Sequence, residues 1–360
     1  MTALLDLLRR RIAVAGPLTV AQYMAEALGH PRHGYYVKQD PLGAAGDFTT
    51  APEISQVFGE LIGLWCADLW QRMGAPDPVL LVELGPGRGT LMQDALRAIG
   101  RAAPGFRAAL RLHLVETSPA LRTAQAARLA DADPAWLDRL ADLPDGPALV
   151  VANEFFDALP IRQWQRGAKG WHERLVGWDE ATGRLRWELS ARADPGLALI
   201  PEAVRDAPEG SIAEACPGGL SHATLLGRRL AQQGGAALIV DYGPARSAPG
   251  DSFQAVRRHT FADPLEAPGE ADLTAHVDFQ ALAQAATQAG ADAQGPVTQG
   301  AFLEALGLRA RAAQLKKASP ARAAEIDAAV DRLAGPQQMG RLFKALALTA
   351  PGLGAPAGFP

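Results

Sequence analysis

A run of glycines beside an acidic residue is the part of this sequence best suited to binding a ligand. The apolar run 79–84 contains Glu83 and is followed directly by three spaced glycines, Gly85, Gly87 and Gly89. Glycines allow positive φ angles and let a ligand approach the main chain closely. A carboxylate inside an apolar run is costly unless something pairs with it. The pattern predicts a ligand site, with a purely structural glycine-rich turn as the alternative.

Regular elements must position these residues. The run 79–84 has the branched apolar residues of a strand buried on both faces, and Thr90 opens an apolar-periodic run typical of a helix. A second strand-like run, 110–115, ends directly before Glu116. At this βαβ spacing an acidic residue accepts hydrogen bonds from both ribose hydroxyls of a nucleoside. The spacing therefore predicts an adenosyl ligand.

The glycine spacing narrows the class of ligand further. Dinucleotide-binding loops have the pattern G-x-G-x-x-G, whereas these glycines stand at every second position. The sequence Arg88-Gly89-Thr90 also lacks the Gly-Lys-Ser/Thr ending of a phosphate-binding loop. Both differences disfavour a nicotinamide dinucleotide dehydrogenase and a nucleoside triphosphatase.

Composition limits the broad class of protein. The chain has 360 residues, of which 48% are apolar and 21% charged, with a formal net charge of -4. These values suit a soluble globular protein with one large or two modest domains, and they argue against a general nucleic-acid binder. Cys66 and Cys216 form no C-x-x-C pair, so we expect neither a metal site nor a disulfide framework.

The N-terminal residues and the apolar runs bear on location. No run approaches the roughly 18 apolar residues of a membrane-spanning helix, so we expect no membrane insertion. The apolar part of residues 1–16 is too short for a signal peptide. Arg9, Arg10 and Arg11 also fit part of an organelle-targeting helix. We interpret them as the solvated face of a first helix and expect a cytoplasmic location.

Regular alternation of strands and helices over 79–153 predicts a Rossmann-like α/β sheet. Helical patterns over 2–14 and 18–28 precede it, and a meander of strands with four tryptophans over 161–190 interrupts it. We therefore expect an N-terminal helical cap and lid loop (1–75), the first part of the sheet domain (76–160), an inserted β-rich subdomain (161–219), the remainder of the sheet domain with a substrate-side insert (220–350, insert 244–335) and a flexible tail (351–360).

An irregular stretch rich in glycine, proline and aromatic residues precedes a predicted helix over 52–70. Long irregular loops of this kind are more often functional than not. We expect residues 46–50 to act as a lid that closes over a bound ligand.

Seven motifs, taken together, resemble the MidA family of class I S-adenosylmethionine-dependent methyltransferases. They occur in the family's order and span most of the chain: GDFTTAPEISQVFGELIG (46–63), VELGPGRGTLMQD (82–94), VETSP (115–119), NEFFDALP (153–160), VDYG (240–243), DLTAHVDF (272–279) and MGRLFKALAL (339–348). The resemblance implies a class I methyltransferase fold with S-adenosylmethionine as cofactor. Mitochondrial members of the family assist assembly of respiratory complex I, and the activity that the resemblance implies for them is dimethylation of an arginine on a complex I subunit.

The resemblance and the motif positions together assign roles to individual residues. Glu83 would orient the glycine loop or bind the cofactor ammonium through water, and Glu116 would bind the ribose. Asn153 and Glu154 lie where the transferred methyl group should point. The full set of expected cofactor-binding residues is Gly46, Phe48, Thr49, Glu83, Gly85, Gly87, Thr90, Glu116, Asp142, Leu143 and Asn153, with Asp142 and Leu143 near the adenine.

Carboxylates are the expected catalytic groups if the nucleophile is a guanidinium. They would hold its charge and raise its nucleophilicity. The candidates are Glu154 and Asp157, with Asp47 and Asp241 behind them. Such acids can also be helix caps or loop ties, and Asp142 can be an ordinary surface acid.

Other functions stay open on the sequence alone. The chain could methylate a small molecule or another side chain, or it could be an assembly chaperone that binds the cofactor without turnover. The sequence does not set the oligomeric state, and a homodimer is one of the options that it leaves open.

Overall fold

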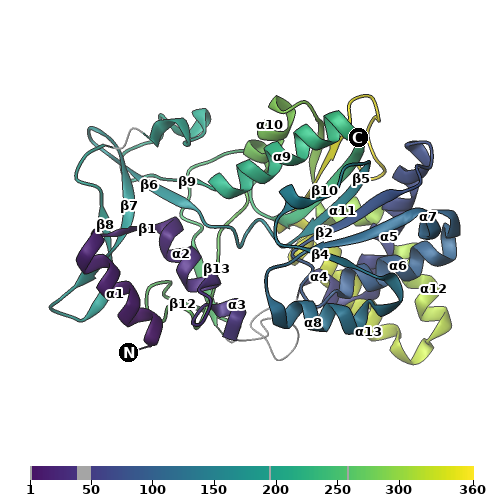
Figure 1. The fold of residues 1–360 in the computed structure, drawn as a ribbon, viewed down its shortest axis with the longest axis horizontal. Helices are drawn as coiled ribbons and strands as arrows, with labels where there is room; N and C mark the ends of the chain where they lie inside the picture. Colours follow the sequence, from purple (N-terminus) through teal and green to yellow (C-terminus); the bar gives the residue numbers. More distant parts are fainter. Residues whose placement is uncertain (1, 39–49, 194–195, 258) are drawn as a thin grey trace. The chain divides into compact units, whose positions relative to one another are not determined.

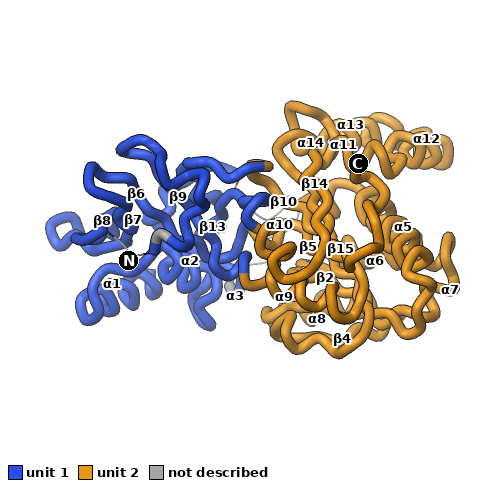
Figure 2. Tube along the Cα trace, turned by 90° about the horizontal axis from the view of Figure 1, so that it is seen from above, with its two compact units in different colours: residues 1–48, 157–220, 246–281 blue, residues 49–156, 221–245, 282–360 orange. Residues whose placement is uncertain are grey.

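The computed structural model describes residues 2–38, 50–193, 196–257 and 259–360 (Figure 1). The chain divides into two compact units, which Figure 2 colours separately. Unit 1 comprises Met1–Phe48, Asp157–Leu220 and Arg246–Ala281, and unit 2 comprises Thr49–Phe156, Ser221–Ala245 and Leu282–Pro360. This division differs from the predicted one: residues 50–75 belong with the sheet domain, and the insert expected over 244–335 is shared between the units.

Unit 2 contains a seven-stranded sheet in the order β14-β15-β10-β5-β2-β3-β4. Strands β10, β5, β2, β3 and β4 pair in parallel, whereas β15 pairs antiparallel with β10 and β14. This sheet confirms the predicted Rossmann-like fold. The strands are β2 (Val79–Leu84), β3 (Leu110–Val115), β4 (Ala135–Leu137), β5 (Ala148–Asn153), β10 (Gly235–Tyr242), β14 (Asp292–Thr298) and β15 (Phe343–Thr349).

Branched apolar residues explain why the central strands form. Every residue of β2, β5 and β10 is buried, as expected for parallel strands covered on both faces. Two glycines of the helix α5 (Gln56–Arg72) allow the helix α6 (Thr90–Ala102) to pack closely against it (Figure 1). A Cβ atom at Gly59 would lie 2.7 Å from the Leu91 carbonyl oxygen, and one at Gly63 would lie 2.7 Å from the Ala95 Cα.

The remaining helices follow the alternation only in part. They are α4 (Ala51–Ile54), α5 (Gln56–Arg72), α6 (Thr90–Ala102), α7 (Pro104–Ala109), α8 (Pro119–Arg128), α9 (Pro217–Gln233), α10 (Phe279–Gln288), α11 (Gln299–Ala305), α12 (Leu308–Ala318), α13 (Ala323–Ala334) and α14 (Met339–Leu342). Apolar periodicity did not predict α7, α12 or α14. None of the helices in the described ranges is long and apolar enough to cross a membrane.

Unit 1 contains the predicted N-terminal helices and the predicted β-rich segment. Its five-stranded sheet has the order β1-β7-β6-β9 with β8 paired to β7, and a second sheet has the order β12-β11-β13. Its elements include α1 (Ala3–Ala15), β1 (Leu18–Thr19), α2 (Val20–Gly29), α3 (Tyr35–Lys38), β6 (Arg162–Gly167), β7 (Gly170–Asp179), β8 (Arg184–Leu189), β9 (Ile212–Ala215), β11 (Gln254–Arg257), β12 (Thr260–Ala262) and β13 (Asp272–Thr274).

Two predicted segments differ from the structure. The helix expected over 52–70 is broken at Ser55, which has an extended backbone and caps α5 through its hydroxyl to the Val57 N–H at 3.3 Å. Residues 244–277, the first part of the expected substrate-side insert, have no strand pattern in the sequence but contain the sheet of β11, β12 and β13. The capping contact of Ser55 and the pairing of strands β11, β12 and β13 decide these structures. Apolar periodicity along the chain does not indicate contacts of either kind.

The prediction of a flexible tail over 351–360 is wrong, because residues 353–359 pack against other parts of unit 2. Phe359 is 9% exposed, and its ring centroid lies 5.3 Å from that of Phe302. Trp65 Nε1 donates to the Ala357 carbonyl oxygen at 3.1 Å, and Arg72 donates to two further tail carbonyls, those of residues 353 and 355. Aromatic and arginine side chains elsewhere in the chain therefore order an alanine- and proline-rich segment.

Candidate functional site

Three predicted site segments meet at the carboxyl edge of the unit 2 sheet. Leu84, the last residue of β2, is in register with Val115 of β3 and with Ala152 of β5. The glycine loop therefore begins beside Glu116 and Asn153, and the Gly85 N–H donates to the Val115 carbonyl oxygen at 3.0 Å. This edge is where doubly wound sheets bind ligands.

The glycine loop requires its glycines. Gly85, Gly87 and Gly89 have φ angles of 62°, 52° and 79°, which side-chain-bearing residues rarely adopt. A Cβ atom at Gly85 would also lie 2.8 Å from the Phe155 ring. The loop thus presents bare main chain at the sheet edge.

Two buried acceptor atoms at this edge have no hydrogen-bond partner within the described part of the chain. They are Oε2 of Glu83, a residue that is 3% exposed, and Oδ1 of Asn153, a residue that is 8% exposed. Burial raises the pKa of Glu83 to about 8. Acceptors at the ends of two neighbouring strands fit a ligand that carries a cationic donor, such as the ammonium group of a methionine moiety. The donor set therefore fits S-adenosylmethionine.

Glu116 follows β3 as the spacing predicts. Its Oε1 accepts a hydrogen bond from the Ser118 N–H at 2.8 Å, which fixes the carboxylate at the start of α8. Burial raises the pKa of Glu116, and the surrounding hydrogen bonds offset this only in part. A fixed, half-buried carboxylate is a suitable acceptor for two neighbouring hydroxyls.

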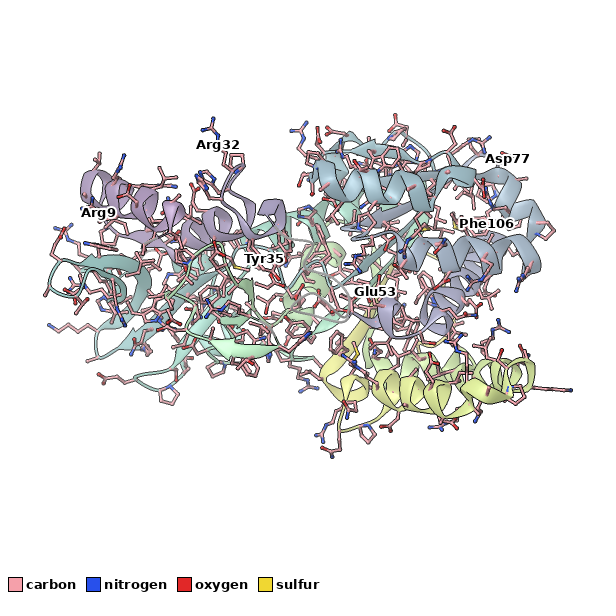
Figure 3. All side chains as sticks on the ribbon, turned by 90° about the horizontal axis from the view of Figure 1, so that it is seen from below. Arg9, Arg32, Tyr35, Glu53, Asp77 and Phe106 are labelled. Atoms are coloured by element: carbon pink, nitrogen blue, oxygen red, sulfur yellow. The ribbon has the colours of Figure 1, made fainter. Side chains whose placement is uncertain are left out.

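The Thr90 hydroxyl is engaged by protein groups that the sequence analysis did not identify. It donates to Oε1 of Glu53 at 2.5 Å, and Arg128 donates to it. Glu53, labelled in Figure 3, lies on α4, and Arg128 lies at the end of α8. Thr90 therefore ties the end of the glycine loop to two helices, and a direct contact with the cofactor stays a prediction.

Glu154 combines an unusual backbone conformation with a capping contact. Its φ angle is 50°, which is uncommon for a residue other than glycine and often marks a functional position. Its Oε1 accepts from the Ala51 N–H at 3.0 Å, at the start of α4, and from Asn153 Nδ2 at 3.2 Å. The carboxylate thus anchors α4 at the same sheet edge.

Asp241 is a loop tie, the alternative that the sequence left open for such acids. It is fully buried, and its two oxygens accept from the Phe156 N–H at 3.0 Å and from the Tyr242 N–H at 2.9 Å. The carboxylate therefore holds the chain that follows β5.

Asp157 belongs to unit 1 and is 7% exposed. Its carbonyl oxygen accepts from the Ala275 N–H at 3.0 Å. Burial, followed by the carboxylates of Asp272 and Asp157, raises the pKa of Tyr36 well above its usual range. The Tyr36 hydroxyl donates to Asp272 Oδ1 at 3.0 Å. Asp157 is therefore part of a buried polar group within unit 1.

The remaining predicted residues are less informative. Asp142 forms an exposed ion pair with Arg139 at 2.8 Å, while the following residue, Leu143, is buried. Their expected contact with adenine stays a prediction. Residues 46–49 of the lid segment, which include the predicted site residues Gly46, Asp47, Phe48 and Thr49, lie outside the described residues.

Sequence comparison assigns the family. Residues 61–297 match the family of S-adenosyl-L-methionine-dependent methyltransferases. The chain is 40% identical over 366 residues to a Danio rerio protein named protein arginine methyltransferase NDUFAF7, mitochondrial, covering 95% of this chain and 86% of the relative. The chain belongs to this methyltransferase family. Its Homo sapiens relative of the same name is 37% identical, with 97% of this chain and 83% of the relative covered.

Solved structures agree with this assignment. A crystal structure of a Burkholderia thailandensis protein bound to S-adenosyl-homocysteine has a TM-score of 0.84 and 29% identity, covering 99% of this chain and 94% of that chain. A second structure from the same organism has a TM-score of 0.82 and 31% identity, covering 99% and 93%. The family therefore uses S-adenosylmethionine, which agrees with the cofactor predicted from the glycine loop and Glu116.

The same comparison corrects one prediction. We expected a cytoplasmic location, but the relatives from Danio rerio, Drosophila melanogaster and Homo sapiens are named as mitochondrial proteins, which contradicts it. Composition and the absence of a long apolar run do not distinguish these compartments, which explains why the sequence argument was wrong.

Proposed function

We propose that this protein transfers a methyl group from S-adenosylmethionine to an arginine side chain of a protein substrate. The observation that carries the proposal is the identity of about 40% over 95% of the chain to relatives named protein arginine methyltransferases. We further propose a subunit of respiratory complex I as the substrate, which the motif resemblance implies.

The sheet edge of unit 2 supplies the residues that would hold the cofactor. Gly85 and Gly87 would lie against its methionine part, the acceptors of Glu83 and Asn153 would face its ammonium group, and Glu116 would accept from the ribose. When bound, S-adenosylmethionine supplies a methyl group on a positively charged sulfur atom. The protein's main task is then to align a nitrogen nucleophile with that methyl group.

Carboxylates have a specific task if the nucleophile is a guanidinium. A guanidinium is protonated at neutral pH, so it must release a proton as the new N–C bond forms. A carboxylate can orient the group through charge-assisted hydrogen bonds and can accept that proton. We propose this role for Glu154, at the edge of the unit 2 sheet, and for Asp157.

The test replaces each charge while it keeps the shape of the side chain. Glu154→Gln retains an oxygen that can accept from the Ala51 N–H, so it removes the charge without necessarily releasing α4. We expect methylation of the substrate by Glu154→Gln and by Asp157→Asn to fall by about 10²-fold, with little change in cofactor affinity. The exposed residues Glu180 and Asp206 provide matched controls as Glu180→Gln and Asp206→Asn.

The outcomes separate the competing functions. Parental methylation rates in both variants would show that these acids are structural and would remove the main chemical support for an arginine nucleophile. A parallel loss of cofactor affinity would place Glu154 in the cofactor pocket instead. The substrate is tested by mass spectrometry of the complex I fraction from cells with and without the gene, and an unchanged set of methylated arginines would contradict a complex I subunit.

A further inference from the structure

Gln125 is a fully buried polar residue on an otherwise solvent-facing helix. It is 0% exposed, and it is the buried residue of α8, which lies between the strands β3 and β4 in the chain. An amide with no exposure costs free energy unless its donors and acceptor are satisfied. The contacts of Gln125 therefore indicate why it is buried.

Each polar atom of the Gln125 amide has a partner in unit 2. Nε2 donates to the Gly87 carbonyl oxygen at 2.7 Å and to Glu116 Oε2 at 3.4 Å. Oε1 accepts from Trp136 Nε1 at 2.8 Å. The two acceptors of the NH₂ group thus belong to the glycine loop and to the carboxylate that follows β3.

Trp136 fixes which way the amide points. An indole N–H can only donate, so the Gln125 oxygen must face Trp136 and the NH₂ group must face Gly87 and Glu116. The Gln125 Cγ also lies 3.6 Å from the position that a Cβ atom would occupy at Gly89. The side chain therefore supports the glycine loop at two of its glycines, in a single orientation.

We propose that Gln125 is a positioning residue that joins the glycine loop to the ribose-binding carboxylate, so that one amide sets both halves of the cofactor site. This inference rests on the proposed cofactor-binding roles of Gly87 and Glu116. Hydrogen bonds to a charged group are stronger than those between neutral groups, and supporting residues of this kind determine how well a site is pre-organised. Apolar periodicity on α8 gave no signal for it.

The charged surroundings of Glu116 make the role measurable. Burial raises the pKa of Glu116, whereas the Ser118 N–H, the Gln125 amide, the Thr117 N–H and the charge of Arg122 lower it. Arg122 also donates through Nε to the Glu116 carbonyl oxygen at 2.7 Å and pairs with Asp138 at 2.7 Å. Loss of the Gln125 donor should therefore raise the pKa of Glu116, which must be ionised to accept from two hydroxyls.

The experiment measures S-adenosyl-homocysteine binding to the full chain by titration calorimetry from acid to neutral pH. Gln125→Met removes the amide and keeps the side-chain length and most of its volume. We expect the Kd at neutral pH to rise on the order of ten-fold, and the acid midpoint of binding to move to higher pH. A residue that only supports folding would lower the unfolding temperature without moving this midpoint. Gln93→Met, on the exposed face of α6, is the matched control.

Two further sets of variants make the result decisive. Trp136→Phe removes the N–H that orients the amide, and it should shift the Kd and the acid midpoint in the same direction by a smaller amount. This variant replaces Gln125→Met as the test if Gln125→Met does not fold. A folded variant of either residue with the parental Kd and acid midpoint would overturn the proposal. If Gly87→Val and Glu116→Gln lose binding while Gln125→Met does not, the positioning role alone fails. If all of them bind normally, the proposed cofactor site itself is wrong.

Discussion

Two buried glutamates of unit 2 have opposite surroundings. Glu60 on α5 and Glu83 on β2 are each 3% exposed. Glu60 Oε2 accepts from Arg311 Nε at 2.7 Å, and its Oε1 accepts from Arg97 at 3.0 Å and from Gln56 at 3.1 Å. Glu83 Oε2, by contrast, has no hydrogen-bond partner among the residues that the structure places.

Their pKa values move in opposite directions as a result. Burial raises the pKa of Glu60, but hydrogen bonds from Arg311 and Arg97 more than offset it, so the pKa is lowered. For Glu83, burial alone acts and the pKa rises to about 8. Glu60, which has a complete set of partners, joins helices α5, α6 and α12. Glu83, whose Oε2 has no partner within the described residues, lies at the edge of the sheet where we propose that the cofactor binds. This difference supports the proposed role of Glu83 in holding the cofactor.

The largest expected effect tests whether the edge beside Glu83 is the cofactor side. Gly87→Val places a β-branched residue at a φ angle of 52°, where the cofactor should approach the main chain. We expect S-adenosylmethionine binding to be lost in calorimetric titration while circular dichroism shows a largely preserved fold. Gly100→Val on the exposed surface of α6 should bind as the parent does. Parental affinity in Gly87→Val would show that the loop is not the site.

The second prediction exchanges the two glutamates for glutamine. Glu60→Gln leaves two arginines without their carboxylate, so we expect the free energy of unfolding to fall by about 2 kcal/mol with cofactor affinity unchanged. Glu83→Gln should instead raise that free energy at neutral pH, because glutamine removes the cost of keeping Glu83 protonated in the fold where the unfolded chain ionises it. Its cofactor affinity should fall by about ten-fold, since the ammonium group of the bound cofactor would favour the ionised form of Glu83, a charge that glutamine cannot supply.

Urea unfolding and calorimetry of the same two proteins check this pair of effects. Equal losses of stability in both variants would erase the contrast between a structural and a ligand-binding acid.

The smallest expected effect is a difference in the pH dependence of stability. The lowered pKa of Glu60 stabilises the fold above its ordinary pKa, and this contribution is lost as the pH falls below that value. The raised pKa of Glu83 stabilises the fold at low pH, and this contribution is lost as the pH rises from the ordinary 4.5 towards about 8. Relative to the parent, Glu60→Gln should therefore weaken the pH dependence of the unfolding free energy below about pH 4.5. Glu83→Gln should weaken this dependence between pH 4.5 and about 8. An identical pH dependence of the unfolding free energy in the two variants would count against the different roles of Glu60 and Glu83.

The central strands could be predicted from the sequence because their signals are local, and the proposed cofactor edge follows from the same strands. The bounds of β2 and β3 agree with the predicted runs, and Glu116 follows β3 as the βαβ spacing requires. The fully buried strands admit branched apolar residues along their whole length, and the left-handed loop positions strongly favour glycine. Composition and spacing are sufficient where one local constraint decides the residue type.

The features that the sequence did not predict depend on partners far along the chain. Gln125 looks like an ordinary polar position on a helix, and only the contacts with Gly87 and Trp136 show its role. The order of the C-terminal segment likewise depends on Trp65 and Phe302. Glu154 was predicted as a catalytic acid, but its capping of α4 requires knowledge of where Ala51 lies.

The place of β15 in the sheet also has a consequence during synthesis of the chain. β15 lies between β10 and β14, yet on the order of 100 residues separate it from β10 in the sequence. A ribosome adds roughly 5–20 residues per second, so β10 is made about 5–20 s before the strand that covers its open edge. Until then its unpaired N–H and C=O groups can pair with other chains. The nascent protein should therefore be most prone to aggregation, and most dependent on chaperones, in the interval between these two strands.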